Sequence, residues 1–194
     1  MVSVPPRLED THVPDEWLSQ QSGSAAIELE ADYWGFDDLY RAVAAYLPKR
    51  YAVADIGCAE ALHSWYFRDH AAYIGVDTWE GGARLCGGMS YATRYLTPNF
   101  REHVMDGRDY ARRLRGLEVV RNMYAIVSAV PCPDLYMDVL KTFPNCATWY
   151  PGDSNVRFQG VHAKEIEGLF WKLTEERRRG WLLHSSVARF SKAS

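Results

Sequence analysis

The stretch YAVADIGCAEALHSWYF, residues 51 to 67, decides the fold class that the sequence predicts. Small and branched apolar residues lead up to Asp55, and a single glycine follows at Gly57. A short apolar run that is closed by glycine is typical of a buried strand ending in a tight turn. We therefore expect a strand, a turn at Gly57 and then a helix over residues 59–70.

Apolar strands and amphipathic helices alternate along the rest of the chain. Helices are predicted over residues 37–50, 108–117, 134–143 and 162–180, and further strands over 71–77, 99–107, 122–130, 146–150 and 181–190. Such alternation predicts a doubly wound α/β fold, in which a mostly parallel sheet has helices on both faces.

Length and composition favour one folded domain. The chain has 194 residues, of which 47% are hydrophobic, enough to bury a single core. Residues 1–36 are rich in Pro, Ser, Gln and acids and are predicted to be an N-terminal arm, with the single α/β domain at 37–194. No apolar run approaches the ~20 residues that span a bilayer, and the first residues do not have the pattern of a secretory signal. We expect a soluble, cytoplasmic protein.

Charge and cysteine usage restrict the partners further. The net charge of -3 argues against a protein whose whole surface binds nucleic acid. The cysteines Cys58, Cys86, Cys132 and Cys146 form no CxxC pair, so the sequence indicates neither a zinc site nor a disulfide framework. Reduced thiols and no bound metal are expected.

Three successive predicted strands end on a carboxylate: Asp55, Asp77 and Asp106. The carboxyl ends of parallel strands lie at one edge of a sheet, where ligands of such folds bind. One carboxylate there can accept hydrogen bonds from both hydroxyls of a ribose. A dinucleotide fits less well, because its pyrophosphate needs further glycines in the first turn and would meet Glu60 beside Asp55. The pattern favours a ligand with a ribose and no phosphate.

With Asp55-Ile56-Gly57 in its first turn and acids ending the next two strands, the segment 39–140 resembles the class I S-adenosylmethionine-dependent methyltransferases. The resemblance implies S-adenosylmethionine as cofactor, with residues 55–61 around its methionine part, Asp77 on the ribose and Asp106 beside the adenine. The cofactor-binding residues that it implies are Asp55, Gly57, Cys58, Ala59, Asp77, Thr78, Trp79, Asp106, Gly107 and Ser128. The chain is short for the family, so the family's last strand hairpin can be missing.

The expected activity is methyl transfer to a small-molecule acceptor, and the sequence identifies no catalytic base. A catalytically inactive S-adenosylmethionine-binding or regulatory protein of the same fold is the main alternative. A nucleic-acid methyltransferase and an NAD-binding oxidoreductase stay open as further ones. No statement about oligomeric state follows from the sequence.

Other residue types with possible chemistry have simpler structural interpretations. Pro131-Cys132 resembles the Pro-Cys pair of cytosine C5-methyltransferases, but we expect Cys132 to be a buried loop thiol and Asp134 to be a helix N-cap. His63 and His70 have no partner at a metal-binding spacing and are predicted to be structural. Residues 78–98 contain two glycine pairs and are predicted either to form a cover over the ligand together with the N-terminal arm, with Trp79 on the adenine, or to be an irregular surface loop.

Overall fold

The structure of the chain is a computed structural model. It describes residues 2–6, 36–58, 61–78, 97–128, 130, 132–150 and 156–190, and within these ranges the side chains of 62 and 180–190 are left out. Most of the predicted arm and of the predicted cover segment, 7–35 and 79–96, therefore lies outside the described residues.

The domain is built on a six-stranded sheet with the order β3-β2-β1-β4-β5-β6. The first five strands are parallel, and β6 runs antiparallel to β5. Strand order reverses between β1 and β4, the place where ligands bind in such sheets. The predicted doubly wound, class I methyltransferase-like α/β fold is confirmed. The strands are β1 (Ala52–Ile56), β2 (Ala72–Asp77), β3 (Phe100–Val104), β4 (Met123–Ser128), β5 (Cys146–Trp149) and β6 (Val156–Gln159).

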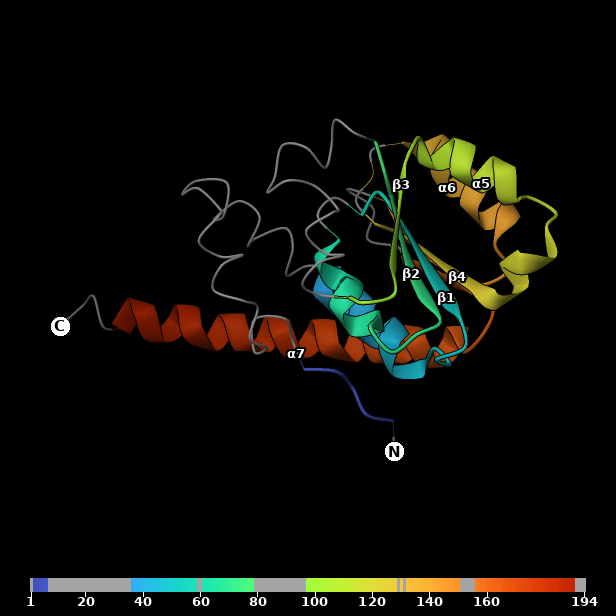
Figure 1. The fold of residues 1–194 in the computed structure, drawn as a ribbon. Coiled ribbons are helices and arrows are strands. Elements are labelled where there is room, and N and C mark those ends of the chain that lie inside the picture. Colours follow the sequence, from blue (N-terminus) through green and yellow to red (C-terminus); the bar gives the residue numbers. More distant parts are fainter. Residues whose placement is uncertain are drawn as a thin grey trace.

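Helices cover both faces of the sheet (Figure 1). One face carries the helix at 36–46, the 3-10 helix η2 (Leu62–Phe67) and α7 (Ala163–Phe190). The other face carries α5 (Gly107–Leu114), α6 (Pro133–Thr142) and the short η3 (Glu118–Asn122).

Alternate residues of β1 serve two separate cores. Val53 is buried with the first helix and α7, whereas Ala54 and Ile56 are buried with α5 and α6. Because side chains of a strand point alternately to its two faces, Asp55 must face the same side as Val53. Because of this alternation, Asp55 points to the opposite face of β1 from Ile56.

The predicted last strand over 181–190 is wrong. These residues continue α7, which runs without a break from Ala163 to Phe190, and the strand that completes the sheet is β6, which was not predicted. Gly180 was expected to end the helix, but one glycine inside a helix costs only about 1 kcal/mol relative to alanine. Four-residue β6 is too short to show a clear alternation, so its pairing with β5 identifies it.

Several predicted boundaries move by a few residues. Phe36, which was assigned to the arm, already belongs to the first helix. The helix predicted over 59–70 is the single 3-10 segment η2, and the third strand ends at Val104, so that Gly107 begins α5. Asp134 is not an N-cap: Cys132 holds that position, Pro133 is the first helical residue, and Asp134 is exposed in the first turn.

Buried charges fasten the first helix to α7. The Asp38 side chain is fully buried, and its Oδ2 accepts a hydrogen bond of 2.8 Å from Nε of Arg177. Arg41 lies 3.5 Å from the other oxygen, Oδ1, and also donates to the backbone carbonyl of Pro5 at 2.9 Å. A charge that is removed from water needs such partners, so the ion pair holds the two helices in register.

Arg177→Gln should destabilise the domain by about 1–3 kcal/mol, because it leaves the buried carboxylate of Asp38 with Arg41 alone. The measurement is the free energy of urea unfolding. Arg179→Gln is the matched control, since its pair with Glu175 is exposed and should change stability by less than about 0.5 kcal/mol. Equal effects of the two substitutions would contradict the assignment.

Candidate functional site

A cavity of about 130 Å³ lies at the carboxyl edge of the sheet, where β1 and β2 end beside the first turns of α5 and α6. Sites that enclose a whole ligand of drug size usually measure ~300–1,000 Å³, so the cavity fits one part of a larger ligand. Its walls are formed by Ile56, Gly57, Val76, Asp77, Thr78, Asp106, Gly107, Arg108, Val130, Cys132 and Leu135.

Two glycines let the walls of the cavity approach each other. Gly57 has φ +81°, in the left-handed region, and an added Cβ would collide with Cγ2 of Val130. At Gly107 an added Cβ would collide with Cγ2 of Ile56 and press on Leu135. Any side chain at either position would therefore close the cavity or push the turn out of place.

Asp77 and Asp106 stand at the polar side of the cavity. Oδ1 of Asp77 accepts a hydrogen bond of 2.7 Å from the backbone N–H of Thr78, which fixes the carboxylate at the end of β2. Asp106 is the N-cap of α5, and its Oδ1 accepts the backbone N–H of Arg108 at 2.8 Å. Both acids are therefore held at the cavity by backbone geometry.

Arg108 joins this polar wall and was not predicted from the sequence. Its guanidinium donates to both oxygens of Asp106, from Nε at 3.0 Å and from a terminal nitrogen at 2.6 Å. These hydrogen bonds lower the pKa of Asp106 to about 2, so the carboxylate is ionised at any physiological pH. Spacing could have suggested the pair, because a residue two positions after an N-cap acid can reach back to it.

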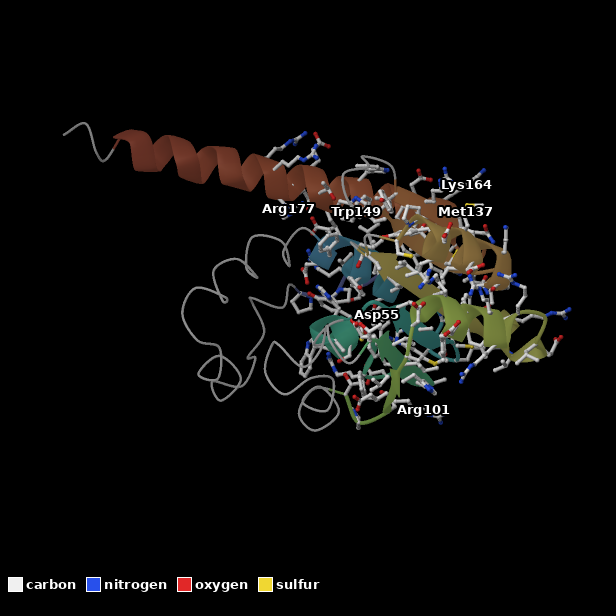
Figure 2. All side chains as sticks on the ribbon, turned by 90° about the horizontal axis from the view of Figure 1, so that it is seen from above. Asp55, Arg101, Met137, Trp149, Lys164 and Arg177 are labelled. Carbon is white, nitrogen blue, oxygen red and sulfur yellow. The ribbon has the colours of Figure 1, made fainter. Side chains whose placement is uncertain are left out.

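Asp55 lies inside the domain (Figure 2) and is not one of the residues that line the cavity. It is only 1% exposed. Oδ1 accepts a hydrogen bond of 2.9 Å from the hydroxyl of Tyr40, and Oδ2 accepts one from the hydroxyl of Tyr73. Ser128 belongs to the same group, with its hydroxyl 3.1 Å from that of Tyr40. Two of the predicted site residues are thus engaged inside the fold.

Burial sets the ionisation of Asp55. Loss of solvation raises its pKa to about 7, although the hydrogen bonds from Tyr73 and Tyr40 act in the opposite direction. The charge of Asp77 also acts to raise the pKa, and the value of about 7 is the balance of all these effects. Near neutral pH the buried carboxyl is therefore divided between its protonated and ionised forms.

The other predicted residues fall into three places. Gly57, Asp77, Thr78, Asp106 and Gly107 line the cavity, and Cys58 is buried in the core on the side of the first helix. Ala59 and Trp79 lie outside the described residues.

Several cavity-lining residues carried no signal in the sequence. In the sequence, Val130 and Leu135 are typical of ordinary core positions. They reach the cavity only because the turn after β4 folds over Gly57. Cys132, predicted to be buried, is half-buried and lines the cavity from the start of α6. Tyr136 holds this turn, because its hydroxyl accepts the N–H of Val130 at 3.1 Å and donates to the carbonyl of Trp149 at 3.0 Å.

Both histidines that were considered as ligands are packed in the interior. The ring of His63 stacks on Tyr40 with 4.0 Å between centroids, and burial lowers its pKa to about 3. Nε2 of His70 lies 3.2 Å from the carbonyl oxygen of Leu47, and burial together with the charge of Lys49 lowers its pKa to about 4. Among the described residues, no three His, Cys, Asp or Glu side chains are grouped to hold a metal ion.

The part of the chain that the structure describes contains no helix long and apolar enough to cross a membrane.

Comparisons with known proteins find similar solved structures. No known protein family matches the sequence, and no curated protein matches it. WbdD matches over 74% of this chain and 29% of its own, with 17% identity and a TM-score of 0.42. A precorrin-6y C5,15-methyltransferase from Geobacter metallireducens matches over 61% of each chain, with 9% identity and a TM-score of 0.44. An rRNA methylase from Streptococcus thermophilus matches over 61% of this chain and 72% of its own, with 11% identity and a TM-score of 0.45.

The chain spans less than a third of the length of WbdD in this match. Matches with only 9% to 17% identity say nothing about function beyond the fold. What the chain binds has to be inferred from its own cavity.

Asp55→Asn should make the domain more stable than the wild type as pH rises. Folded Asp55 keeps its proton up to about pH 7, whereas an unfolded aspartic acid releases it near pH 4. The stability that this group contributes is therefore present at low pH and lost between about pH 4 and pH 7. Asparagine does not titrate and loses no such contribution. The free energy of unfolding of Asp55→Asn should therefore exceed that of the wild type by up to about 4 kcal/mol at pH 8.

Urea unfolding of both proteins between pH 4.5 and 8 measures this difference. Asp134→Asn, in an exposed helical turn, is the control and should follow the wild type at every pH. A stability difference for Asp55→Asn that does not change with pH would contradict the raised pKa.

Proposed function

We propose that the chain binds S-adenosylmethionine, with the adenosine part in the cavity at the carboxyl edge of the sheet, and transfers its methyl group to a small-molecule acceptor. The observation that carries the proposal is that one cavity joins Gly57, Asp77 and Asp106 from the ends of three successive strands. The volume of the cavity suits part of such a ligand and leaves its methionine end outside.

The ribose would bind at Asp77. The carboxylate stands at the end of β2 and is oriented by the N–H of Thr78. Two ribose hydroxyls are both donors, and charge-assisted hydrogen bonds to one carboxylate are among the stronger polar contacts in a binding site. Loss of this acceptor would remove both contacts at once.

The adenine would lie beside Asp106, between apolar walls. A carboxylate has about four lone-pair positions, and three hydrogen bonds from Arg108 fill two on Oδ1 and one on Oδ2. Among the described residues one position on Oδ2 thus stays available for the amino group of adenine. Ile56, Val76 and Leu135 supply the apolar surface that a ring requires.

The charges of the site favour a ligand without phosphates. Arg108 is a cation at the cavity, but Asp106 neutralises it in a two-contact ion pair. Asp77 adds a second carboxylate to the same wall, and carboxylates repel a pyrophosphate and attract the sulfonium and ammonium groups of S-adenosylmethionine. This charge distribution supports the methyl donor over a dinucleotide.

Methyl transfer from a sulfonium is an in-line displacement, for which the protein mainly has to hold donor and acceptor in line. The cavity supplies the donor side. We propose a small-molecule acceptor because the net charge is slightly negative and the sequence contains no region typical of nucleic-acid recognition. The alternative is a protein of this fold that binds the cofactor but does not catalyse methyl transfer.

Titration calorimetry with S-adenosylmethionine, its demethylated product and NADH tests the ligand. We expect both sulfur compounds to bind and NADH not to bind. If neither sulfur compound binds to the folded protein at millimolar concentration, the proposal is contradicted. Binding of NADH alone would support an oxidoreductase.

Asp77→Ala should weaken binding of the demethylated product by about 1.5–3 kcal/mol, because a charged acceptor of two hydroxyls is lost. Asp69→Ala is the matched control, since Asp69 is an exposed acid before β2, at the opposite edge of the sheet. An unchanged affinity of Asp77→Ala would show that the ribose binds elsewhere.

Incubation with methyl-labelled cofactor and fractionated cell extract tests the transfer. Label in small metabolites is the expected outcome. Label in nucleic acid or protein would change the proposed acceptor, and binding of the cofactor without any transfer would favour the inactive alternative.

A further inference from the structure

A buried polar group lies next to the cavity but on the other face of β1. We call it the Asp55 network, and its members are Tyr40, Asp55, Tyr73 and Ser128. Asp55 faces the first helix, whereas its neighbour Ile56 faces α5 and α6 and lines the cavity. Only the peptide bond between Asp55 and Ile56 therefore separates the network from the cavity wall.

Asp55 is placed where it cannot touch a ligand in the cavity. It is 1% exposed, and each of its oxygens accepts a tyrosine hydroxyl, Oδ1 that of Tyr40 at 2.9 Å and Oδ2 that of Tyr73. In the pairing of β1 with β2, Gly75 stands beside Asp55, and Tyr73 lies two residues before it on the same strand.

The network joins three elements around the end of β1. Tyr40 comes from the first helix, Tyr73 from β2, and Ser128 from the last position of β4, where its hydroxyl is 3.1 Å from that of Tyr40. Stacking of His63 on Tyr40 and of Phe67 on Tyr73 fixes the two rings. The side chain of Asp55 is thus held directly from β2 and from the first helix, and from β4 only through Tyr40.

Asp55 lies two residues before the turn that forms one wall of the cavity. Two residues later the chain adopts φ +81° at Gly57, whose N–H donates to the carbonyl of Val76 at 2.7 Å. The next N–H, of Cys58, points to the same carbonyl at 3.4 Å. With only one peptide between the held side chain and this turn, a shift of Asp55 would move Ile56 and Gly57 together.

We propose that Tyr40 and Tyr73 are positioning residues for the cofactor site: through the carboxylate of Asp55 they hold the end of β1, so that Ile56 and Gly57 form the cavity wall, and Asp55 itself does not contact the ligand. The effect on affinity rests on the proposed function, whereas the effect on the turn does not depend on it.

The network gives the site a dependence on pH. An ionised Asp55 accepts both hydroxyls, but a protonated one has an O–H of its own to place and holds them less well. Burial raises the pKa of Asp55 to about 7, and each tyrosine hydroxyl lowers it. Removal of either hydroxyl should therefore raise the pKa above that of the wild type. The titratable, charged and polar groups around Asp55 are Tyr40, Tyr73, Asp77, Cys58, His63 and Ser128.

Tyr40→Phe and Tyr73→Phe test the proposal, with Tyr124→Phe as the matched control. Phenylalanine keeps each ring and removes only the hydroxyl. Tyr124 is fully buried in the same core, and its hydroxyl has no hydrogen-bond partner among the described residues. The control therefore loses a buried hydroxyl of the same kind without touching Asp55.

The first readout needs no ligand. Carbon NMR follows the titration of the Asp55 carboxyl, and amide hydrogen exchange follows Gly57 and Cys58. We expect each of the two variants to raise the Asp55 midpoint by about one pH unit and to speed exchange at Gly57 about tenfold, while the control stays at the wild-type values. Circular dichroism checks that each variant is folded, and either variant alone is sufficient for the test.

The second readout is the affinity for the demethylated cofactor between pH 6 and pH 9. Binding to the wild type should weaken below about pH 7. In each variant the loss of affinity should begin at a higher pH, in step with the raised midpoint of Asp55. At pH 7 each variant should therefore bind about tenfold more weakly than the wild type. A purely structural role would lower affinity equally at every pH.

Two results would overturn the proposal. One is unchanged exchange at Gly57 and Cys58 in both folded variants, and the other is an effect of Tyr124→Phe as large as theirs. If the wild type does not bind the cofactor, the proposed function fails, and the ligand-free readout still decides whether the tyrosines hold the turn.

Discussion

β1 pairs in parallel with β2 on one side and with β4 on the other, and this pairing sets the positions of all the elements that form the cavity. It places the ends of three strands at one edge and reverses the strand order there. Asp77 at the end of β2, Asp106 after β3 and the turn after β1 meet at this edge, because parallel strands end on the same side. The cavity is a consequence of that pairing together with two glycines, Gly57 and Gly107, that let the turns approach.

The two faces of β1 have separate tasks. Ile56 contributes to an apolar core and to the cavity wall, whereas Asp55 carries a carboxylate into the interior, where burial opposes its ionisation. A buried acid is tolerated when donors surround it, and here Tyr40 and Tyr73 are those donors. Asp106 shows the opposite arrangement: it is partly exposed, paired with Arg108 and firmly ionised. Asp55 and Asp106 thus have opposite environments and opposite ionisation.

The first helix connects this interior to the ends of the chain. Its Tyr40 reaches Asp55, its Asp38 pairs with Arg177 of α7, and its Arg41 donates to the carbonyl of Pro5. These contacts run over the same face of the sheet that α7 crosses before it extends beyond the domain (Figure 1). The helix that supports the network is therefore itself held by both the amino-terminal residues and α7.

The fold class, the five parallel strands and the glycine turn could be predicted from the sequence, because each follows from a local pattern: apolar runs of strand length, helical spacing, and a glycine directly after a strand. The prediction also placed Asp77 and Asp106 at one edge. The remaining features depend on contacts between segments that lie far apart in the chain. The choice of Asp55 for the interior depends on tyrosines 15 and 18 residues away, the antiparallel strand β6 exists through its pairing with β5, and α7 continues past Gly180. No local pattern contains such contacts, since their free energy comes from burial and hydrogen bonds that form when the chain has folded.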